Sequence, residues 1–138
     1  MKTNFFNLVV IAFLFAACTD TDTSTRLQGT YEGVFYRVTN NVKGESSNVT
    51  LNFSDDRYTG TSSIVKYPAL CEGTFTPSSE EIHFRNTCMW TAEFDWTLIL
   101  DGTFKVTRTA DEIVLAKEIN SSNGDYYVLR KQDGQTSR

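Results

Sequence analysis

The stretch CEGTFTPSSEEIHFRNTC, residues 71–88, has the pattern of a β-hairpin. Residues 70–77 and 82–87 have the composition of short strands, and the four residues between them are a common hairpin connection. This register places Phe75 directly opposite Phe84. Two aromatic side chains would then share one face of the pair, which predicts that this face packs against a core.

Strand signals recur along the rest of the chain, and apolar residues do not repeat at helical spacing. Alternation is clearest at Val49, Leu51 and Phe53, and from Trp90 to Leu100, where every second residue is apolar. One face of each segment must therefore meet a core. Nine candidate strands result: residues 30–39, 48–54, 58–66, 70–76, 82–87, 90–100, 103–108, 112–119 and 125–131.

The predicted fold class is all-β, a small antiparallel up-and-down meander. Turn clusters such as Asn40-Asn41 and residues 121–124 separate consecutive strands. Such a meander can close into a barrel, here of about eight or nine strands, which removes its edges; the alternative is a β-sandwich. Residues 27–131 form one domain of about 100 residues, and residues 132–138 are expected to be a disordered tail.

The first seventeen residues have the layout of a secretory signal peptide. A basic Lys2 precedes an apolar run that ends in Ala16 and Ala17, and this run falls short of the about 20 residues that span a membrane. The residues Leu14-Phe15-Ala16-Ala17-Cys18 resemble the lipobox of bacterial lipoproteins, with Phe15 where an aliphatic residue is usual. The resemblance implies cleavage before Cys18, acylation of its sulfur and often of its amine, and therefore lasting membrane attachment.

Residues 18–26 follow as the lipidated cysteine and a tether. The tether alternates Thr and Asp and has no apolar residue to bury. Acidic residues here resemble the surface-export signals of Bacteroidota lipoproteins, although any solvated tether looks similar. The expected location is the cell envelope, with the lipid in the outer membrane and the periplasmic or surface face left open.

The acidic balance of the chain argues against nucleic acid as a partner. The formal charge is −4, and loss of Lys2 with the signal peptide makes it −5. An acidic surface repels phosphates. The expected partners are the membrane, through the lipid, and either a small apolar ligand or a protein of the envelope.

Cys71 and Cys88 are expected to form a disulfide. An exported domain meets an oxidising environment, and the hairpin register sets the two cysteines opposite each other. Closing a loop of this size stabilises by about 3 kcal/mol in the chain-entropy model. A redox or metal role has no support, because Cys-x-x-Cys spacing and a histidine cluster are absent from the sequence.

The segment LQGTYEG, residues 27–33, resembles the opening of lipocalin-like (calycin) barrels, whose first strand carries Gly-x-Trp. In that family the tryptophan plugs the closed barrel end, and a basic residue from near the end of the chain packs over it. Tyr31 stands at the tryptophan position, and Arg130 is the candidate partner. The alternative is a core tyrosine and an unrelated surface arginine.

Catalytic chemistry is not evident, so we expect no enzyme, no cofactor and no metal. The single histidine, His83, alternates with Ile82 and Phe84 and therefore points outward. Two functions remain. The first is a binder of a small apolar ligand, in a cup lined by Phe75, Phe84, Trp90, Phe94 and Trp96; the alternative for these side chains is a plain packed core. The second is a protein-interaction module or inhibitor that acts through loops, where Met89 and the stretch Tyr67-Pro68-Ala69 are candidate contacts.

The acylation hypothesis makes a mass prediction. The intact mass of the membrane-extracted protein should equal residues 18–138 plus two or three acyl chains, because cleavage and acylation converge on Cys18. Cys18→Ser should abolish the acyl mass. A mature form that begins at another residue and lacks acyl mass would contradict the hypothesis.

Overall fold

The computed structural model describes residues 26–132. The predicted signal peptide, Cys18 and all of the tether except Arg26 lie outside the described residues. The tail predicted at residues 132–138 also lies outside them, apart from Gln132.

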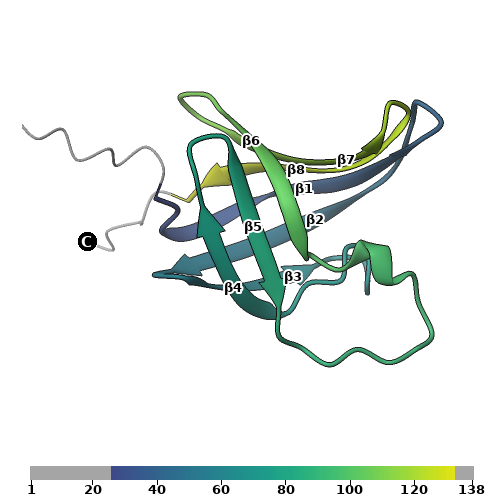
Figure 1. The fold of residues 1–138 in the computed structure, drawn as a ribbon, viewed down its shortest axis with the longest axis horizontal. Helices are drawn as coiled ribbons and strands as arrows, with labels where there is room; N and C mark the ends of the chain where they lie inside the picture. Colours follow the sequence, from purple (N-terminus) through teal and green to yellow (C-terminus); the bar gives the residue numbers. More distant parts are fainter. Residues whose placement is uncertain (1–25, 133–138) are drawn as a thin grey trace, which may run out of the picture.

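Eight antiparallel strands close into a barrel in the order of the sequence (Figure 1). Each strand pairs with the next, and the last pairs with the first. The predicted all-β meander and closed barrel are confirmed, and the sandwich alternative is wrong. The strands are β1 (Gly29–Thr39), β2 (Val42–Ser54), β3 (Arg57–Ser62), β4 (Glu72–Pro77), β5 (Glu81–Asn86), β6 (Gly102–Arg108), β7 (Ile113–Asn120) and β8 (Asn123–Lys131).

Local sequence explains the tight turns. Asn40 and Asn41 both have positive φ, 51° and 62°, which suits the two-residue turn between β1 and β2. In the β4–β5 hairpin, Phe75 lies opposite Phe84, as the sequence predicts. Glycine is required where the barrel closes, because a Cβ on Gly33 of β1 would collide with the carbonyl group of Val128 on β8.

The strand predicted at residues 90–100 is wrong. These residues belong to the connection between β5 and β6, which contains only a short 3-10 turn, η2 (Trp96–Leu98). Strand β5 pairs directly with β6, and Ile82 lies opposite Phe104. The sheet therefore leaves no place for a further strand between them, and the alternating apolar residues of this segment lie in a loop.

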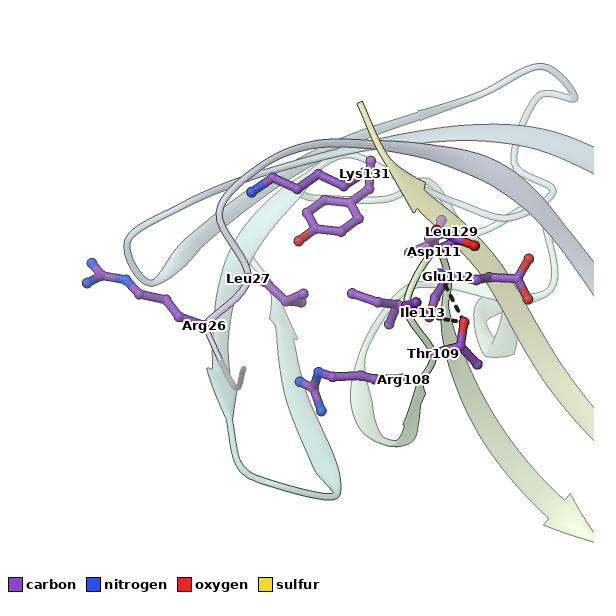
Figure 2. Close-up of a pocket in the computed structure, with 11 residues that line it drawn as sticks. Arg26, Leu27, Arg108, Thr109, Asp111, Glu112, Ile113, Leu129 and Lys131 are labelled. Carbon is purple, nitrogen blue, oxygen red and sulfur yellow. Dashed lines mark hydrogen bonds between the residues drawn. The ribbon is translucent and has the colours of Figure 1, made fainter. Parts of the chain in front are cut away.

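The two ends of the barrel are built differently. At the near end, β1 begins, β8 ends and the other connections are short turns; Leu27 folds over this end (Figure 2). At the far end lie the β1–β2 and β7–β8 turns and the two longest connections, residues 63–71 and 87–101 (Figure 1). The described chain thus starts and finishes at the near end, opposite its longest loops.

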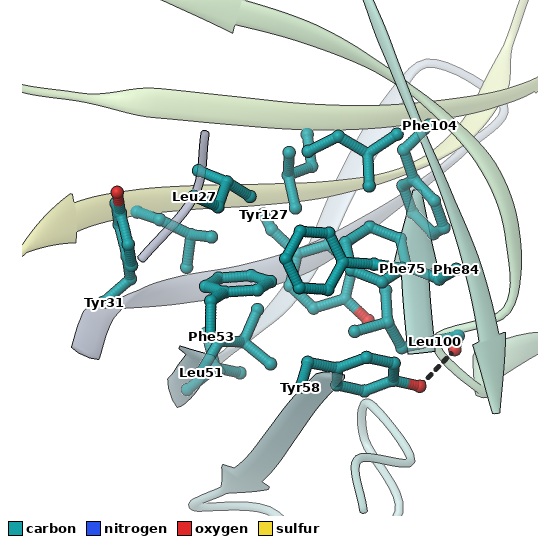
Figure 3. Packing of buried hydrophobic residues seen from close by; sticks show 14 of the residues in the cluster. Leu27, Tyr31, Leu51, Phe53, Tyr58, Phe75, Phe84, Leu100, Phe104 and Tyr127 are labelled. Carbon is teal, nitrogen blue, oxygen red and sulfur yellow. Dashed lines mark hydrogen bonds between the residues drawn. The ribbon is translucent and has the colours of Figure 1, made fainter. Parts of the chain in front are cut away.

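Aromatic rings fill the interior (Figure 3). Most of the contacting rings meet edge to face, the geometry that aromatic pairs favour. The hydroxyl of Tyr58 donates to the carbonyl oxygen of Leu100 at 2.9 Å, so this buried polar group is satisfied. The ring contacts that span the barrel are Tyr31–Phe53 (5.5 Å), Phe53–Phe75 (5.0 Å), Tyr58–Phe84 (5.3 Å), Phe84–Phe104 (5.6 Å), Phe104–Tyr127 (5.8 Å), Phe35–Tyr127 (4.9 Å) and Phe35–Tyr67 (5.2 Å).

The eight strands and this buried cluster lie entirely within residues 26–132. A chain of residues 18–138 therefore contains the complete barrel and its core.

Removal of one central ring tests the packing. Phe84 is fully buried, so Phe84→Ala should lower the free energy of unfolding by about 3–5 kcal/mol, measured by urea denaturation. Its neighbour Arg85 points to solvent, and Arg85→Ala should change stability by less than about 0.5 kcal/mol. A loss below about 1 kcal/mol for Phe84→Ala would mean that the interior is not packed around this ring.

Candidate functional site: a loop platform at the far end

The two longest connections are joined into one unit, which we call the loop platform (residues 63–71 and 87–101). The predicted disulfide between Cys71 and Cys88 is confirmed and links them, with 6.4 Å between the Cα atoms. Ala69 also pairs with the second loop: its N–H donates to the carbonyl of Leu98 at 3.0 Å, and its carbonyl accepts from Leu100 at 3.3 Å. The loops are therefore held to each other by covalent and backbone bonds.

Arg37 fastens the loop platform to the barrel wall. Its Nε and Nη2 donate to the two carboxylate oxygens of Asp125 on β8, at 2.6 and 2.7 Å. Its Nη1 donates to Asp95 at 2.7 Å, and Nη2 also reaches the carbonyl of Thr97 at 3.2 Å. Only 5% of the Asp125 side chain is exposed, so the paired carboxylate is withdrawn from water and the bond is strengthened.

Asp95 organises the second loop locally. Its Oδ1 accepts from the Thr97 hydroxyl at 2.6 Å and from the Thr97 N–H at 2.9 Å, which caps the 3-10 turn. These hydrogen bonds from Thr97, followed by the one from Arg37, lower the pKa of the Asp95 carboxyl group. The loop thus holds Asp95 in its charged form.

The residues predicted to line one ligand cup are separated. Phe75 and Phe84 lie inside the barrel, 3% and 0% exposed. Trp90, Phe94 and Trp96 lie on the loop platform and pack against one another, with ring centroids 5.5 and 6.1 Å apart. The predicted set of five side chains therefore does not form one cavity.

The outer surface of the loop platform is apolar in places. Val65 is 85% exposed, Met89 99% and Trp96 54%. The Lys66 ammonium group lies 4.8 Å from the centre of the Phe94 ring, a cation–π contact between the two loops. Met89 was predicted as a contact residue; Val65 was missed, because it falls within the strand predicted at residues 58–66, which ends at Ser62 in the structure.

The predicted pair at the near end is not formed. Tyr31 is buried there, but Arg130 lies opposite Glu32, points outward with 72% of its side chain exposed, and lies 3.5 Å from Glu112. Tyr31 instead lines a hollow of about 360 Å³ together with Arg108. Burial raises the pKa of Tyr31, and the charge of Arg108 partly opposes this shift. The signal for Arg108 was its alternation with Phe104 and Val106, which places all three on the inner face.

The described residues offer no second site built on His83 or on metal-ligating side chains. His83 is exposed, and its Nδ1 lies 3.1 Å from the Thr103 hydroxyl. Within residues 26–132, His, Cys, Asp and Glu side chains form no group of three that could hold a metal ion. That same part of the chain contains no helix of the length and apolarity needed to cross a membrane.

No family model, curated protein or solved structure matches this chain.

The role of Asp95 predicts an acid-sensitive loop platform. Because its pKa is lowered in the folded protein, Asp95 contributes stability above its unfolded pKa of about 4, and this is lost as the pH falls through the folded value. Both tryptophans of the chain lie on the loop platform, so their fluorescence should change in acid before far-ultraviolet circular dichroism does. Asp95→Asn should remove this separate transition. A variant that titrates like the unaltered protein would show that another group controls it.

Proposed function

We propose that this protein is an envelope lipoprotein, acylated on Cys18, whose lipocalin-like barrel carries a protein-interaction site on the loop platform. The observation that carries the proposal is the exposure of three large apolar side chains, Val65, Met89 and Trp96, on a covalently and ionically fixed pair of loops. Exposed apolar groups of this kind mark interaction sites in soluble domains. Tryptophan and methionine are also enriched where protein partners meet.

A rigid surface suits binding because less entropy is lost when the complex forms. The Cys71–Cys88 disulfide and the bonds from Arg37 already fix the loops in the free protein. We therefore expect Met89 and Trp96 to reach a partner without reorganisation of the backbone.

The alternative is a small apolar ligand inside the barrel. An eight-stranded barrel is just wide enough for its own side chains or for one small ligand. Here the rings of Phe53, Phe75 and Phe84 already contact each other at the centre. An interior ligand would have to displace them, so the loop platform is the better candidate.

The two ends of the barrel indicate how the protein would be oriented relative to its membrane anchor. If Cys18 is acylated, the seven residues between it and Arg26, which make eight Cα-to-Cα steps, allow a separation of at most about 30 Å. The eleven residues of β1, tilted as in other barrels, add about 28 Å from the near end to the far end. The lipid anchor would therefore be attached at the near end of the barrel, and the loop platform at the far end would be free to meet a partner.

Charge indicates what kind of partner fits. The cations that contact the loop platform are already engaged, Arg37 of β1 with two carboxylates and Lys66 with the Phe94 ring. The exposed carboxylates of Glu45, Glu72 and Glu93 make no ion pair among the described residues. The partner we propose is an envelope protein with an apolar cleft bordered by Lys or Arg.

Photocrosslinking in the native cells tests this proposal. A p-benzoylphenylalanine at position 89 should give one light-dependent adduct with a partner protein, whereas the same group at exposed Thr107 on the barrel wall should not. Because the contact is apolar and charge-complementary, Trp96→Ala or Glu93→Lys should remove most of the adduct. Equal adducts at both positions, no adduct at position 89, or an adduct that survives both substitutions would contradict the proposal.

A further inference from the structure

The hollow at the near end has an apolar floor and a basic rim. Its floor includes Leu27, Ile113 and Leu129, and Arg26 and Lys131 stand at its edge (Figure 2). Its volume of about 360 Å³ is at the lower limit of small-molecule sites. This is enough for a headgroup and a short length of apolar chain.

Arg108 lines this hollow and carries two buried donors without an acceptor in the described part of the chain. Its Nη1 donates to the carbonyl oxygen of Ser79 at 3.1 Å. Its Nε and Nη2 are buried, and within residues 26–132 they have no hydrogen-bond partner. Buried donors of a charged group are costly to leave unsatisfied, so these two N–H groups call for an acceptor that the described chain does not provide.

The same chain shows what those two nitrogens can hold. At the far end, Arg37 uses its Nε and Nη2 to bind both oxygens of the Asp125 carboxylate, at 2.6 and 2.7 Å. Nε and Nη2 form the side of the guanidinium group that presents two parallel donors to an oxyanion. In Arg108 the same two nitrogens have no acceptor among residues 26–132.

The carboxylates near the hollow do not fill this role. Glu112 lies 3.5 Å from Arg130, on the outside of the barrel, and Asp111 is exposed on the β6–β7 turn. Arg26 is 3.4 Å from Asp55 in an exposed pair, which contributes little. Arg108 and Lys131 make no salt bridge among the described residues.

We infer that the near-end hollow binds an anionic amphiphile, with a phosphate or carboxylate on the Nε and Nη2 of Arg108 and the start of an apolar chain on Leu27, Ile113 and Leu129. This site is separate from the loop platform and does not depend on the proposed protein partner. Two sources supply such a ligand, a lipid headgroup in a membrane and a free amphiphile. The proposed acylation would keep the near end close to membrane lipids.

Calorimetric titration tests the site directly. The protein is residues 18–138 with Cys18→Ser, and the probes are hexyl phosphate, inorganic phosphate and the uncharged hexyl glucoside. Hexyl phosphate should bind saturably and at least about tenfold more tightly than either of the others, because only it supplies both the oxyanion and the chain. Equal binding of inorganic phosphate would overturn the amphiphile part of the inference, and equal binding of hexyl glucoside would overturn the role of charge.

Matched variants distinguish binding at Arg108 from attraction of the ligand by any positive charge at this end of the barrel. Arg108→Gln should weaken hexyl phosphate binding by about tenfold or more, and Arg108→Lys should also weaken it, because lysine lacks the two parallel donors. Arg130→Gln, an arginine of the same barrel end that is paired outside, should leave it within about twofold. Circular dichroism and the melting temperature verify folding. A folded Arg108→Gln variant that binds like the unaltered protein would overturn the inference.

Vesicles distinguish the two sources. If the ligand is a membrane lipid, the same protein should co-sediment with phosphatidylglycerol vesicles and lose this on Arg108→Gln. Binding of hexyl phosphate without vesicle binding would support the site and assign it to a free amphiphile. Absence of both would overturn it.

Discussion

Ring-to-ring packing inside the barrel is the constraint on which the rest of the structure depends. Eight strands enclose a space that side chains can just fill. Here Phe53, Phe84, Phe104 and Tyr127 occupy it, with 5.6 to 6.4 Å between the centroids of contacting rings. Because the centre is used for stability, recognition must be built at the two ends of the barrel.

Each end of the barrel has a partly buried arginine, and the two differ in the hydrogen bonds that their guanidinium groups make. Arg37 at the far end donates hydrogen bonds from all three of its side-chain nitrogens, and the result is a fixed loop platform joined to β8. Arg108 at the near end has the same side of its guanidinium group buried and without an acceptor among the described residues. One arginine therefore supports a surface, and the other is prepared to receive a ligand. Both roles follow from the strong preference of a buried guanidinium group for an oxyanion.

The sequence predicts much of the fold because the information is local. The β4–β5 register follows from a four-residue connection, and this register also brings Cys71 and Cys88 together. The Asn40-Asn41 turn follows from residues that tolerate positive φ. Strand order follows because short connections join antiparallel neighbours.

The candidate site depends on contacts between distant residues, and these could not be predicted. Alternation from Trp90 to Leu100 looks like a strand, but Asp95 is bound by Arg37, 58 positions earlier in the chain. Arg130 could have been placed correctly, because Tyr127 and Leu129 face inward and the next residue must face outward. Arg108 follows the same rule with Phe104, but its missing acceptor is visible only when the whole barrel end is assembled.

A crystal of residues 18–138 pressurised with xenon tests the filled interior most directly, because xenon enters apolar voids that are otherwise empty. The account predicts no ordered xenon among the rings of Phe53, Phe75 and Phe84. Xenon enclosed by these rings would show a cavity at the centre of the barrel and would contradict the account.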